Sequence, residues 1–412
     1  MWQDRILRSR LGNKTRYRAV TVRKRSPFVP RVAKHSAANL LSKHGLTASL
    51  GPFWKALPLM AAIALFDIVW IGPNLRVGWD FPQFWAMARI PLSDRADPDN
   101  MIAQERVLLS KTVAPDVVPY VRPQAFSLIL KPLAWLDLVP AFRVWVVLQV
   151  AALGALLWKL RRITGAPWPM LALVGLYKPA VMGVAMGQDI AVVALLSMLA
   201  FVCLKTGRDS LAGFLFGLCL YKFNLFWTIP LFLLANKRWQ ALTVFGITGA
   251  VLAAVSCWIM PAGNYLAYLG NIGKYQPAYN PATLGVGLKG IAALFGYPSI
   301  YFVLAPLLLA SAYWGLRLFD EELGFALLLT ISLFCGYYVT EYDYTLLLIP
   351  VFILMKRSFG LYRALSIGAL AVPFVWLYPL PQLSFLAAFA GAMLVFAWRA
   401  AAVNPNRGWQ MV

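Results

Sequence analysis

The sequence predicts an all-α polytopic membrane protein, and two observations carry this prediction. Of the 412 residues, 60% are hydrophobic and only 13% are charged, and the apolar residues recur in stretches longer than a soluble core helix needs. These stretches also lack the alternation of a membrane β-barrel. Because hydrocarbon offers no partner to backbone N–H and C=O groups, the segments that cross the membrane must be helices.

A basic segment, residues 1–52, precedes the first apolar stretch. It holds a single acid, Asp4, and its basic residues include Arg5, Arg8, Arg10, Arg23, Lys24, Arg25, Arg31 and Lys34. The positive-inside rule therefore predicts a cytoplasmic N-terminus. Attraction to lipid headgroups is worth about 1 kcal/mol per Lys or Arg, so we expect anionic membrane lipids, and no nucleic acid, as the partner of this segment. Its composition predicts no order away from a membrane, and it also fits a transit peptide.

The first predicted span covers about residues 53–73, runs outward and is followed by a polar loop of about fifty residues. The apolar stretch that ends this loop is short and is broken by Lys131 and Pro132. We interpret residues 124–138 as an interfacial helix and 140–160 as the second span. If residues 124–138 crossed the membrane, the span 140–160 would end on the outer face, together with the basic residues Lys159, Arg161 and Arg162.

Basic residues then recur between apolar stretches and mark the cytoplasmic side: Arg161, Arg162, Lys205, Arg208, Lys237, Arg238, Arg317, Lys356, Arg357 and Arg399. The spans fitted between them are about 166–187, 189–205, 210–222, 224–236, 241–260, 300–318, 323–340, 344–356, 361–379 and 382–399. The total is about twelve spans, with both termini cytoplasmic. The predicted organisation is thus a basic segment, a transmembrane domain over 53–400 and a cytoplasmic tail at 401–412.

Two of these spans, 210–222 and 224–236, are shorter than the ~20 residues that a bilayer requires. They predict a broken pair that meets at Lys222, or a helix that re-enters the membrane. Lysine at such a place either extends to the outer interface or binds an anion. A lipid phosphate is a suitable anion for its compact ammonium group.

Acidic residues gather on the side opposite the basic residues. Ten of the sixteen lie in or beside predicted extracytoplasmic segments: Asp80, Asp94, Asp97, Asp99, Glu105, Asp116, Asp137, Asp189, Glu341 and Asp343. A solvated turn explains the three that lie within 93-SDRADPD-99. Four others adjoin the outer end of an apolar segment: Asp80, Asp189, Glu341 and Asp343. A charge at such a position costs desolvation unless it is paired or lines a wet cavity.

Asp80 lies among aromatic residues, in the stretch 80-DFPQFWAMA-88. Burial there would raise the pKa of its carboxyl toward that of a useful general base. The alternative is an ion pair at the membrane interface, with Arg76, Arg89 or Arg122 as the partner.

Histidine and cysteine usage narrows the chemistry. The two histidines, His35 and His44, both lie in the basic segment, and the four cysteines lie singly within apolar stretches. This pattern excludes a histidine base, a histidine-held metal and a Ser-His-Asp triad from the transmembrane domain, and it predicts no disulfide framework or zinc site. Proton transfer must then rest on carboxylates, Tyr, Lys or Cys.

Six elements follow one another in a recognisable order: 80-DFPQFWAMA-88, 120-YVRPQAFSLILKPLAWL-136, 187-GQDIAVVALL-196, 213-GFLFGLCLYKFNLFWTIPLFLLANKRW-239, 280-NPATLGVGLKGIAALFG-296 and 340-TEYDYTLLLIP-350. Over about residues 53–400, this order resembles the polyprenyl-phosphate-dependent glycosyltransferases of the GT-C superfamily. The closest resemblance is to the bacterial glycosyltransferase family 87, which includes mannosyltransferases.

The resemblance implies a GT-C-like bundle with helices in its extracytoplasmic loops, located in the bacterial inner membrane. It implies transfer of a hexose, mannose first, from a polyprenyl-phosphate sugar donor to a hydroxyl of a lipid or glycan acceptor on the extracytoplasmic face, with inversion. Asp80 would be the general base, and Lys222, ahead of Arg122 or Lys274, would bind the donor phosphate. Further substrate-binding residues would be Phe81, Trp85, Gln188, Asp189, Glu341, Tyr342 and Asp343. No metal or other cofactor is expected, because Lys and Arg can stabilise a lipid monophosphate leaving group.

Two other functions are compatible with parts of the sequence. A transporter or lipid flippase without catalytic chemistry would place acids near the bilayer midplane, a depth that only Asp67 approaches, and would show repeat symmetry. A catalytically inactive relative could act as a scaffold whose basic segment recruits a cytoplasmic partner.

Overall fold

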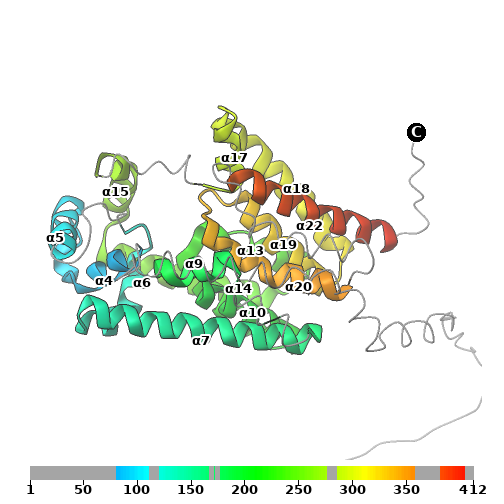
Figure 1. The fold of residues 1–412 in the computed structure, drawn as a ribbon, viewed down its shortest axis with the longest axis horizontal. Coiled ribbons are helices and arrows are strands. Elements are labelled where there is room, and N and C mark those ends of the chain that lie inside the picture. Colours follow the sequence, from blue (N-terminus) through cyan, green and yellow to red (C-terminus); the bar gives the residue numbers. More distant parts are fainter. Residues whose placement is uncertain are drawn as a thin grey trace, which may run out of the picture. The chain divides into compact units, whose positions relative to one another are not determined.

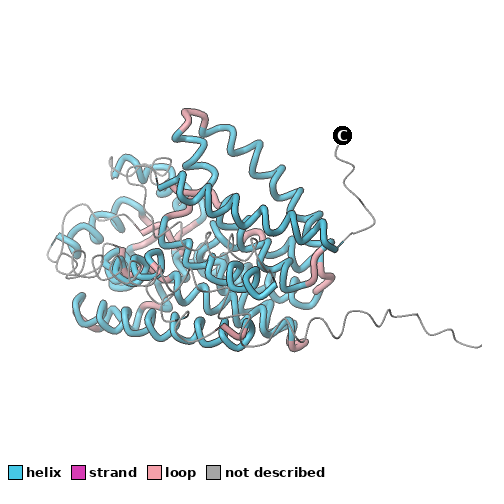
Figure 2. Tube along the Cα trace, turned by 45° about the vertical axis from the view of Figure 1, so that its right-hand side comes forward, coloured by secondary structure: helices cyan, strands magenta, loops and turns pink. Residues whose placement is uncertain are grey.

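Helices make up the regular structure of the part of the chain that the computed structural model describes, as Figure 2 shows. The described residues are 80–110, 120–166, 171, 177–275, 285–357 and 381–403, and all of them belong to one unit of the chain, Lys55–Val412. The basic segment 1–52 and the predicted spans at 53–73 and 361–379 lie outside the described residues, as do most of the tail and Asp67.

In chain order, the α-helices and 3₁₀ helices are α4 (Phe81–Arg89), η3 (Leu92–Asp94), α5 (Pro98–Ser110), α6 (Gln124–Ile129), η4 (Lys131–Trp135), α7 (Leu138–Thr164), α9 (Lys178–Met186), α10 (Ile190–Lys205), α11 (Asp209–Leu218), η5 (Cys219–Lys222), α12 (Phe223–Phe226), α13 (Ile229–Ala235), α14 (Trp239–Ile259), α15 (Ala262–Tyr275), α17 (Leu288–Leu294), η6 (Pro298–Ile300), α18 (Tyr301–Leu318), α19 (Glu321–Cys335), η7 (Glu341–Leu347), α20 (Leu348–Arg357) and α22 (Pro381–Val403).

Within the described residues, three helical segments are long and apolar enough to cross a membrane. They are α7, α14 and the stretch Pro298–Leu318, which contains α18, and the number rises to five if each of two bent helix pairs counts as one span. The apolar face of α7 includes exposed residues such as Val147 and Val150, which suits contact with lipid. The chain is therefore an all-helical membrane protein in its described part, and the count of about twelve spans stays a prediction.

One of the two bent pairs falls on the two short predicted spans, 210–222 and 224–236. Helices α11, η5 and α12 together form one arm, which meets α13 at 116°, so the predicted bent pair, a broken span or a re-entrant helix, is confirmed. The bend itself lies between Phe226 and Ile229, whereas Lys222 ends η5 within the first arm. The second pair, α9 and α10, meets at 119° across Gly187, Gln188 and Asp189. Helix α9 has nine residues, so it is too short to cross a bilayer by itself.

The stretch 124–138 is not continuous with the long helix after it. Helix α6 ends at Ile129, η4 covers Lys131–Trp135, and α7 begins only at Leu138. Pro132 explains why α6 does not continue through this stretch, because proline removes a backbone donor and its ring disfavours a continuing α-helix. The separation of this short helical stretch from the second span is therefore confirmed.

Helices α11 and α14 pack closely through two glycines four residues apart. A Cβ on Gly213 would lie 2.2 Å from the carbonyl oxygen of Ala241, and one on Gly217 would lie 2.5 Å from Cβ of Thr248. Small residues at this spacing let two helix backbones approach, which is a common way to pack helices within membranes.

Ion pairs gather at one end of the helix bundle. Arg238, at the N-cap of α14, bonds Asp209 at 3.2 Å and Glu321 at 2.5 Å, and these acids begin α11 and α19. Glu322 accepts bonds from Lys356 and Arg357 at the end of α20. All of these residues are predicted to be cytoplasmic. Helices α4, α5 and α15 lie near the start of α7, away from this ion-pair layer (Figure 1).

Candidate active site

Asp80 lies at the N-cap of α4, held by the backbone of the α9–α10 bend. Its N–H donates to the carbonyl of Met186 at 2.9 Å, and its Oδ1 accepts a bond from Nε2 of Gln83 at 3.4 Å. The side chain is half-buried. Burial raises the pKa of Asp80, while a hydrogen bond with Gln188 and the charges of Arg122 and Lys222 act against the rise. A carboxyl with a raised pKa suits proton abstraction near neutral pH.

The aromatic residues after Asp80 form the packing that positions it. Phe81 is 1% exposed, and its ring packs against Phe142 and Trp145, with centroids 5.5 and 6.1 Å away. Trp85 is 4% exposed, and its Nε1 donates to the carbonyl of Leu136. Both side chains thus make core contacts with the start of α7 and the residues before it, and the assignment of substrate contacts to them stays a prediction.

A cluster of buried charges lies beside Asp80, and we call its four residues Arg122, Asp189, Lys222 and Asp343 the charge cluster. Lys222 is 1% exposed, and its Nζ lies 2.5 Å from Oδ1 of Asp343 and 3.4 Å from Oδ1 of Asp189. Nη2 of Arg122 lies 3.3 Å from the same oxygen of Asp189 and donates to Oε1 of Gln188 at 3.0 Å. Burying these charges is tolerable only because each has an opposite charge in contact.

Each member of the charge cluster comes from a break or a start of a helix. Arg122 precedes α6, Asp189 lies in the bend between α9 and α10, Lys222 ends η5, and Asp343 lies in the first turn of η7. At the end of a helix, backbone groups lack partners within the helix, and side chains can point along its axis. Residues that are distant in the sequence can therefore meet there. Asp343 has a second role, because its Oδ2 accepts bonds from N and Oγ1 of Thr340, both at 3.0 Å, and caps η7.

Tyr342 and Glu341 border the cluster. The ring of Tyr342 lies 5.3 Å from Nζ of Lys222. Glu341 is half-buried, and burial raises its pKa to about 7, with the charge of Lys178 opposing the rise. Both residues are carried by η7, which packs on α9 and α10.

The structure thus brings together most of the predicted site residues: Asp80, Arg122, Gln188, Asp189, Lys222, Glu341, Tyr342 and Asp343. Lys274 lies near the end of α15, and its side chain lies outside the described part of the protein. Within the described ranges, no three His, Cys, Asp or Glu side chains lie close enough to hold a metal ion.

One acid of the polar loop that follows the first predicted span is buried. Glu105 on α5 is 3% exposed, and its Oε1 has no hydrogen-bond partner in the described structure. Burial raises its pKa to about 8, and a hydrogen bond from the backbone of Tyr120 opposes the rise. The signal was available in the sequence, because Met101, Ile102 and Leu109, which are also buried, share one helical face with it.

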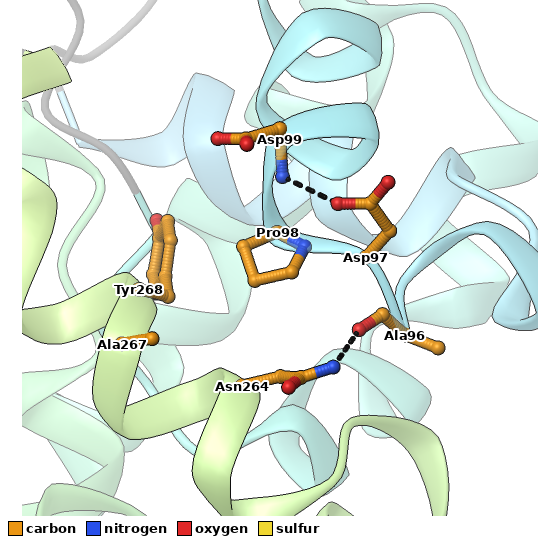
Figure 3. Close-up of a pocket in the computed structure, with 7 residues that line it drawn as sticks. All are labelled: Ala96, Asp97, Pro98, Asp99, Asn264, Ala267 and Tyr268. Atoms are coloured by element: carbon orange, nitrogen blue, oxygen red, sulfur yellow. Dashed lines mark hydrogen bonds between the residues drawn. The ribbon is translucent and has the colours of Figure 1, made fainter.

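A cavity of about 540 Å³ opens between the loop before α5 and helix α15 (Figure 3). Its lining residues are Ala96, Asp97, Pro98, Asp99, Asn264, Ala267 and Tyr268. Asn264 closes one side by donating to the carbonyl of Ala96 at 2.7 Å. The hydroxyl of Tyr268 donates to the carbonyl of Tyr120 at 2.9 Å, so α15 also supports the segment that carries Arg122.

The family model of glycosyltransferase family 87 matches residues 120–350, which is more than half of the chain. The chain belongs to glycosyltransferase family 87. The match confirms the resemblance drawn from the sequence motifs, and it contains the whole charge cluster, whereas Asp80 lies before it. No curated protein and no solved structure matches the chain. As a family 87 member, the protein is a membrane glycosyltransferase, which requires a sugar donor and an acceptor.

Proposed function

We propose that this family 87 glycosyltransferase moves a hexose, with mannose as the first candidate, from a polyprenyl-phosphate donor to a hydroxyl of a lipid or glycan acceptor. The observation that carries the proposal is the arrangement of a half-buried carboxylate, Asp80, beside the buried cations Arg122 and Lys222. A displacement at a sugar carbon needs a base on one side of the reacting carbon and positive charge at the leaving phosphate on the other.

Asp80 takes the proton of the acceptor hydroxyl, and the oxygen attacks the anomeric carbon. The new C–O bond forms as the bond from that carbon to the phosphate oxygen breaks, and its electron pair leaves with the polyprenyl phosphate. A single displacement of this kind inverts the configuration of the sugar. The raised pKa of Asp80 supports its role as the base, because the carboxylate then has more affinity for the proton.

Arg122 is the stronger candidate for the phosphate contact. Its Nε is buried and has no hydrogen-bond partner among the described residues, so it can donate to an anion without breaking a bond. Lys222, by contrast, already contacts Asp343 and Asp189. A guanidinium also matches phosphate oxygens in a bidentate arrangement. Lys222 then serves to hold the two acids and to add positive charge nearby.

The proposed location is the extracytoplasmic face of a bacterial inner membrane, within a GT-C-like bundle of about twelve spans with both termini cytoplasmic. The ion-pair layer supports this orientation, since Arg238, Lys356 and Arg357 lie at helix ends opposite those that carry Lys222 and Asp343. Membership in a glycosyltransferase family disfavours the transporter or flippase alternative.

The test uses purified protein in lipid, supplied with radiolabelled polyprenyl-phosphate mannose and a crude lipid extract. Wild type is compared with Asp80→Asn, which keeps the shape of the side chain and removes the base. The expected result is a loss of transfer by about 100-fold or more with unchanged donor binding. Asp137→Asn is the matched control, because the side chain of Asp137 is 90% exposed. Equal transfer by Asp80→Asn and wild type would exclude Asp80 as the base. Absence of transfer by wild type itself would favour the catalytically inactive scaffold.

A further inference from the structure

The cavity of Figure 3, which we call the α15 cavity, has an acidic lining. Two of its seven lining residues are acids, Asp97 and Asp99, and none of the seven is basic. Figure 3 shows both acids on the side of α5 and Asn264 on the side of α15. A phosphate or an anionic lipid headgroup would meet two negative charges there, without a lining cation to balance them. The lining therefore favours a ligand that carries no negative charge.

The polar groups of the α15 cavity suit hydroxyl groups. Oδ1 of Asp97 accepts the N–H of Asp99 at 3.0 Å, and an ionised carboxylate has further lone pairs for a second donor. Nδ2 of Asn264 donates to the carbonyl of Ala96 at 2.7 Å, which uses one of its two N–H groups, and the amide oxygen can accept. A hydroxyl both donates and accepts, and its bond to a carboxylate is about twice as strong as one between neutral groups. A ligand with several neighbouring hydroxyls therefore matches this lining.

The size and the access of the α15 cavity also suit a sugar. Its volume of about 540 Å³ lies within the range of about 300–1,000 Å³ that is usual for small-ligand sites. Pro98 and Ala267 add apolar surface, against which the C–H groups of a sugar ring can pack. Apart from Tyr268, the lining residues are exposed or half-buried, so a ligand can enter from water.

Direct contacts join the wall of the α15 cavity to the candidate active site. The hydroxyl of Tyr268 donates to the carbonyl of Tyr120 at 2.9 Å. Tyr120 is two residues before Arg122, so their Cα atoms are at most about 7 Å apart. The ring of Tyr120 also packs edge-on against Phe84 of α4, with centroids 6.2 Å apart, and Asp80 is the N-cap of that helix. The cavity therefore lies close to both the proposed base and the proposed phosphate contact.

A ligand in the α15 cavity must extend along α4 to reach Asp80. Nε and Nη2 of Arg95 donate to the carbonyl of Ile90 at 3.1 and 2.7 Å. Ala96, which lines the cavity, is thereby held near the C-terminal end of α4, whereas Asp80 lies at the N-terminal end. Helix α4 has nine residues and is about 14 Å long. A single hexose does not cover this distance, whereas an oligosaccharide of a few units does.

We propose that the α15 cavity binds a neutral oligosaccharide acceptor by a sugar unit distant from the one that reacts. Asp97 and Asn264 bind hydroxyls of that distant unit, and the reacting hydroxyl lies at Asp80. The assignment rests on the proposed function and narrows its acceptor from a lipid or glycan to a glycan whose bound part carries no negative charge. The donor phosphate stays at Arg122, and the acceptor approaches from the acidic side.

The test measures binding of α-linked mannose oligosaccharides of one to four units to the full-length protein in neutral lipid nanodiscs, without donor. We expect the tetrasaccharide to bind wild type about tenfold tighter than mannose does, or more. Ala267→Phe fills the cavity and should abolish this gain. Leu266→Phe is the matched control, because Leu266 is the neighbouring residue of α15, is 68% exposed and is not among the lining residues.

A second variant tests the hydroxyl contact. Asp97→Asn keeps an oxygen for the N–H of Asp99 and removes the charge, and we expect it to weaken binding of the tetrasaccharide by about tenfold. Asp137→Asn is its control, since Asp137 is an exposed acid that does not line the cavity.

Three binding results would overturn the proposed glycan site. Ala267→Phe that binds the tetrasaccharide as wild type does would exclude the cavity, and so would equal affinity of wild type for mannose and the tetrasaccharide. Tighter binding of butane-1,4-diamine than of the tetrasaccharide would assign the cavity to a cationic ligand.

Transfer from polyprenyl-phosphate mannose to the tetrasaccharide is measured separately. Ala267→Phe should raise the KM for the acceptor by about tenfold or more with an unchanged KM for the donor, a split that a general loss of folding would not produce. An unchanged acceptor KM in this variant contradicts the glycan site and leaves the proposed function standing. Binding that depends on chain length, without any transfer by wild type, contradicts the proposed function and leaves the glycan site standing.

Discussion

At the scale of single residues, the buried charges are the groups whose environment depends most on the fold. Lys222 and Asp343 are 121 residues apart and meet at 2.5 Å, and Asp189 contacts both Lys222 and Arg122. Removing one partner from such a group leaves an uncompensated charge in the interior. The sequence predicted Asp189 and Asp343 as site residues from their place at the outer end of an apolar stretch and Lys222 from its place between two short ones, whereas Arg122 came from the family resemblance. It did not predict that the acids neutralise the cations, because pairing depends on contacts between distant helices.

Glu105 gives a pH-dependent prediction at the same scale. Its pKa rises from 4.5 to about 8 in the fold because of burial, so the fold favours the neutral form. The stabilisation is fully present below pH 4.5 and is lost as the pH rises through about 8. We expect Glu105→Gln, which is neutral at every pH, to melt within error of wild type near pH 4.5 and at least about 2–4 °C higher at pH 9.

The measurement is thermal unfolding in one detergent across this pH range. Asp137→Asn serves as the control, because Asp137 has an exposed side chain and should shift the curve by less than about 1 °C. Parallel curves for wild type and Glu105→Gln would show that Glu105 is not held neutral by the fold.

At the scale of elements, the bend between α9 and α10 determines the geometry of the site. Gly187 adopts φ of +76°, and a Cβ there would lie 2.5 Å from Cβ of Phe81. The same bend carries Gln188 and Asp189, and its preceding residue Met186 accepts the backbone bond of Asp80. One glycine thus allows α4 to approach the bend and places the proposed base next to the charge cluster.

Gly187→Ala should therefore damage both the backbone and the site. An alanine in the left-handed conformation costs about 1 kcal/mol. Its Cβ would also clash with Phe81 and displace α4. We expect transfer activity to fall by tenfold or more. Gly165→Ala is a close control, because Gly165 has φ of +72° and nothing within 4 Å of its Cβ position, so it carries the backbone cost alone. Equal activity of the two variants would show that the contact between the bend and Phe81 does not position the site.

The sequence predicted elements well where one physical property dominates. Uninterrupted apolar runs gave α7, α14 and α18 to within a few residues, because partition into hydrocarbon depends on local composition. It failed where backbone geometry depends on neighbours. The bend between α12 and α13 lies after Phe226 and not at Lys222, since a lysine paired with two acids can be buried within a helical arm.

At the scale of the whole molecule, charges separate to the two ends of the helices. The ion-pair layer holds Arg238, Glu321 and Glu322, and the charge cluster lies beyond the other ends of α11 and α19. Helix α19 has 15 residues, so it spans about 22 Å of the distance between them. An apolar layer between two charged layers is the arrangement that a bilayer requires of a spanning protein.

This separation predicts which residues face each side of the membrane. In a cysteine-free background, Asn264→Cys on α15 should react with a membrane-impermeant maleimide in right-side-out vesicles, and Ser210→Cys on α11 should react only in inside-out vesicles. Both residues are exposed in the structure, so lack of reaction would reflect the membrane barrier. The opposite pattern of labelling would place the charge cluster on the cytoplasmic face and contradict the proposed use of an extracytoplasmic donor.

The sequence by itself determined that this protein is a helical membrane protein of glycosyltransferase family 87, and it singled out most of the charged residues that the fold brings together beside Asp80. These properties follow from hydropathy, charge and motif order along the chain, each of which acts locally. Only the tertiary structure decided that Phe81 and Trp85 pack into the core, that Glu105 is buried, and that Asp189 and Asp343 neutralise Lys222. Burial and pairing are set by which helix ends meet, and that depends on long-range packing at breaks such as Gly187.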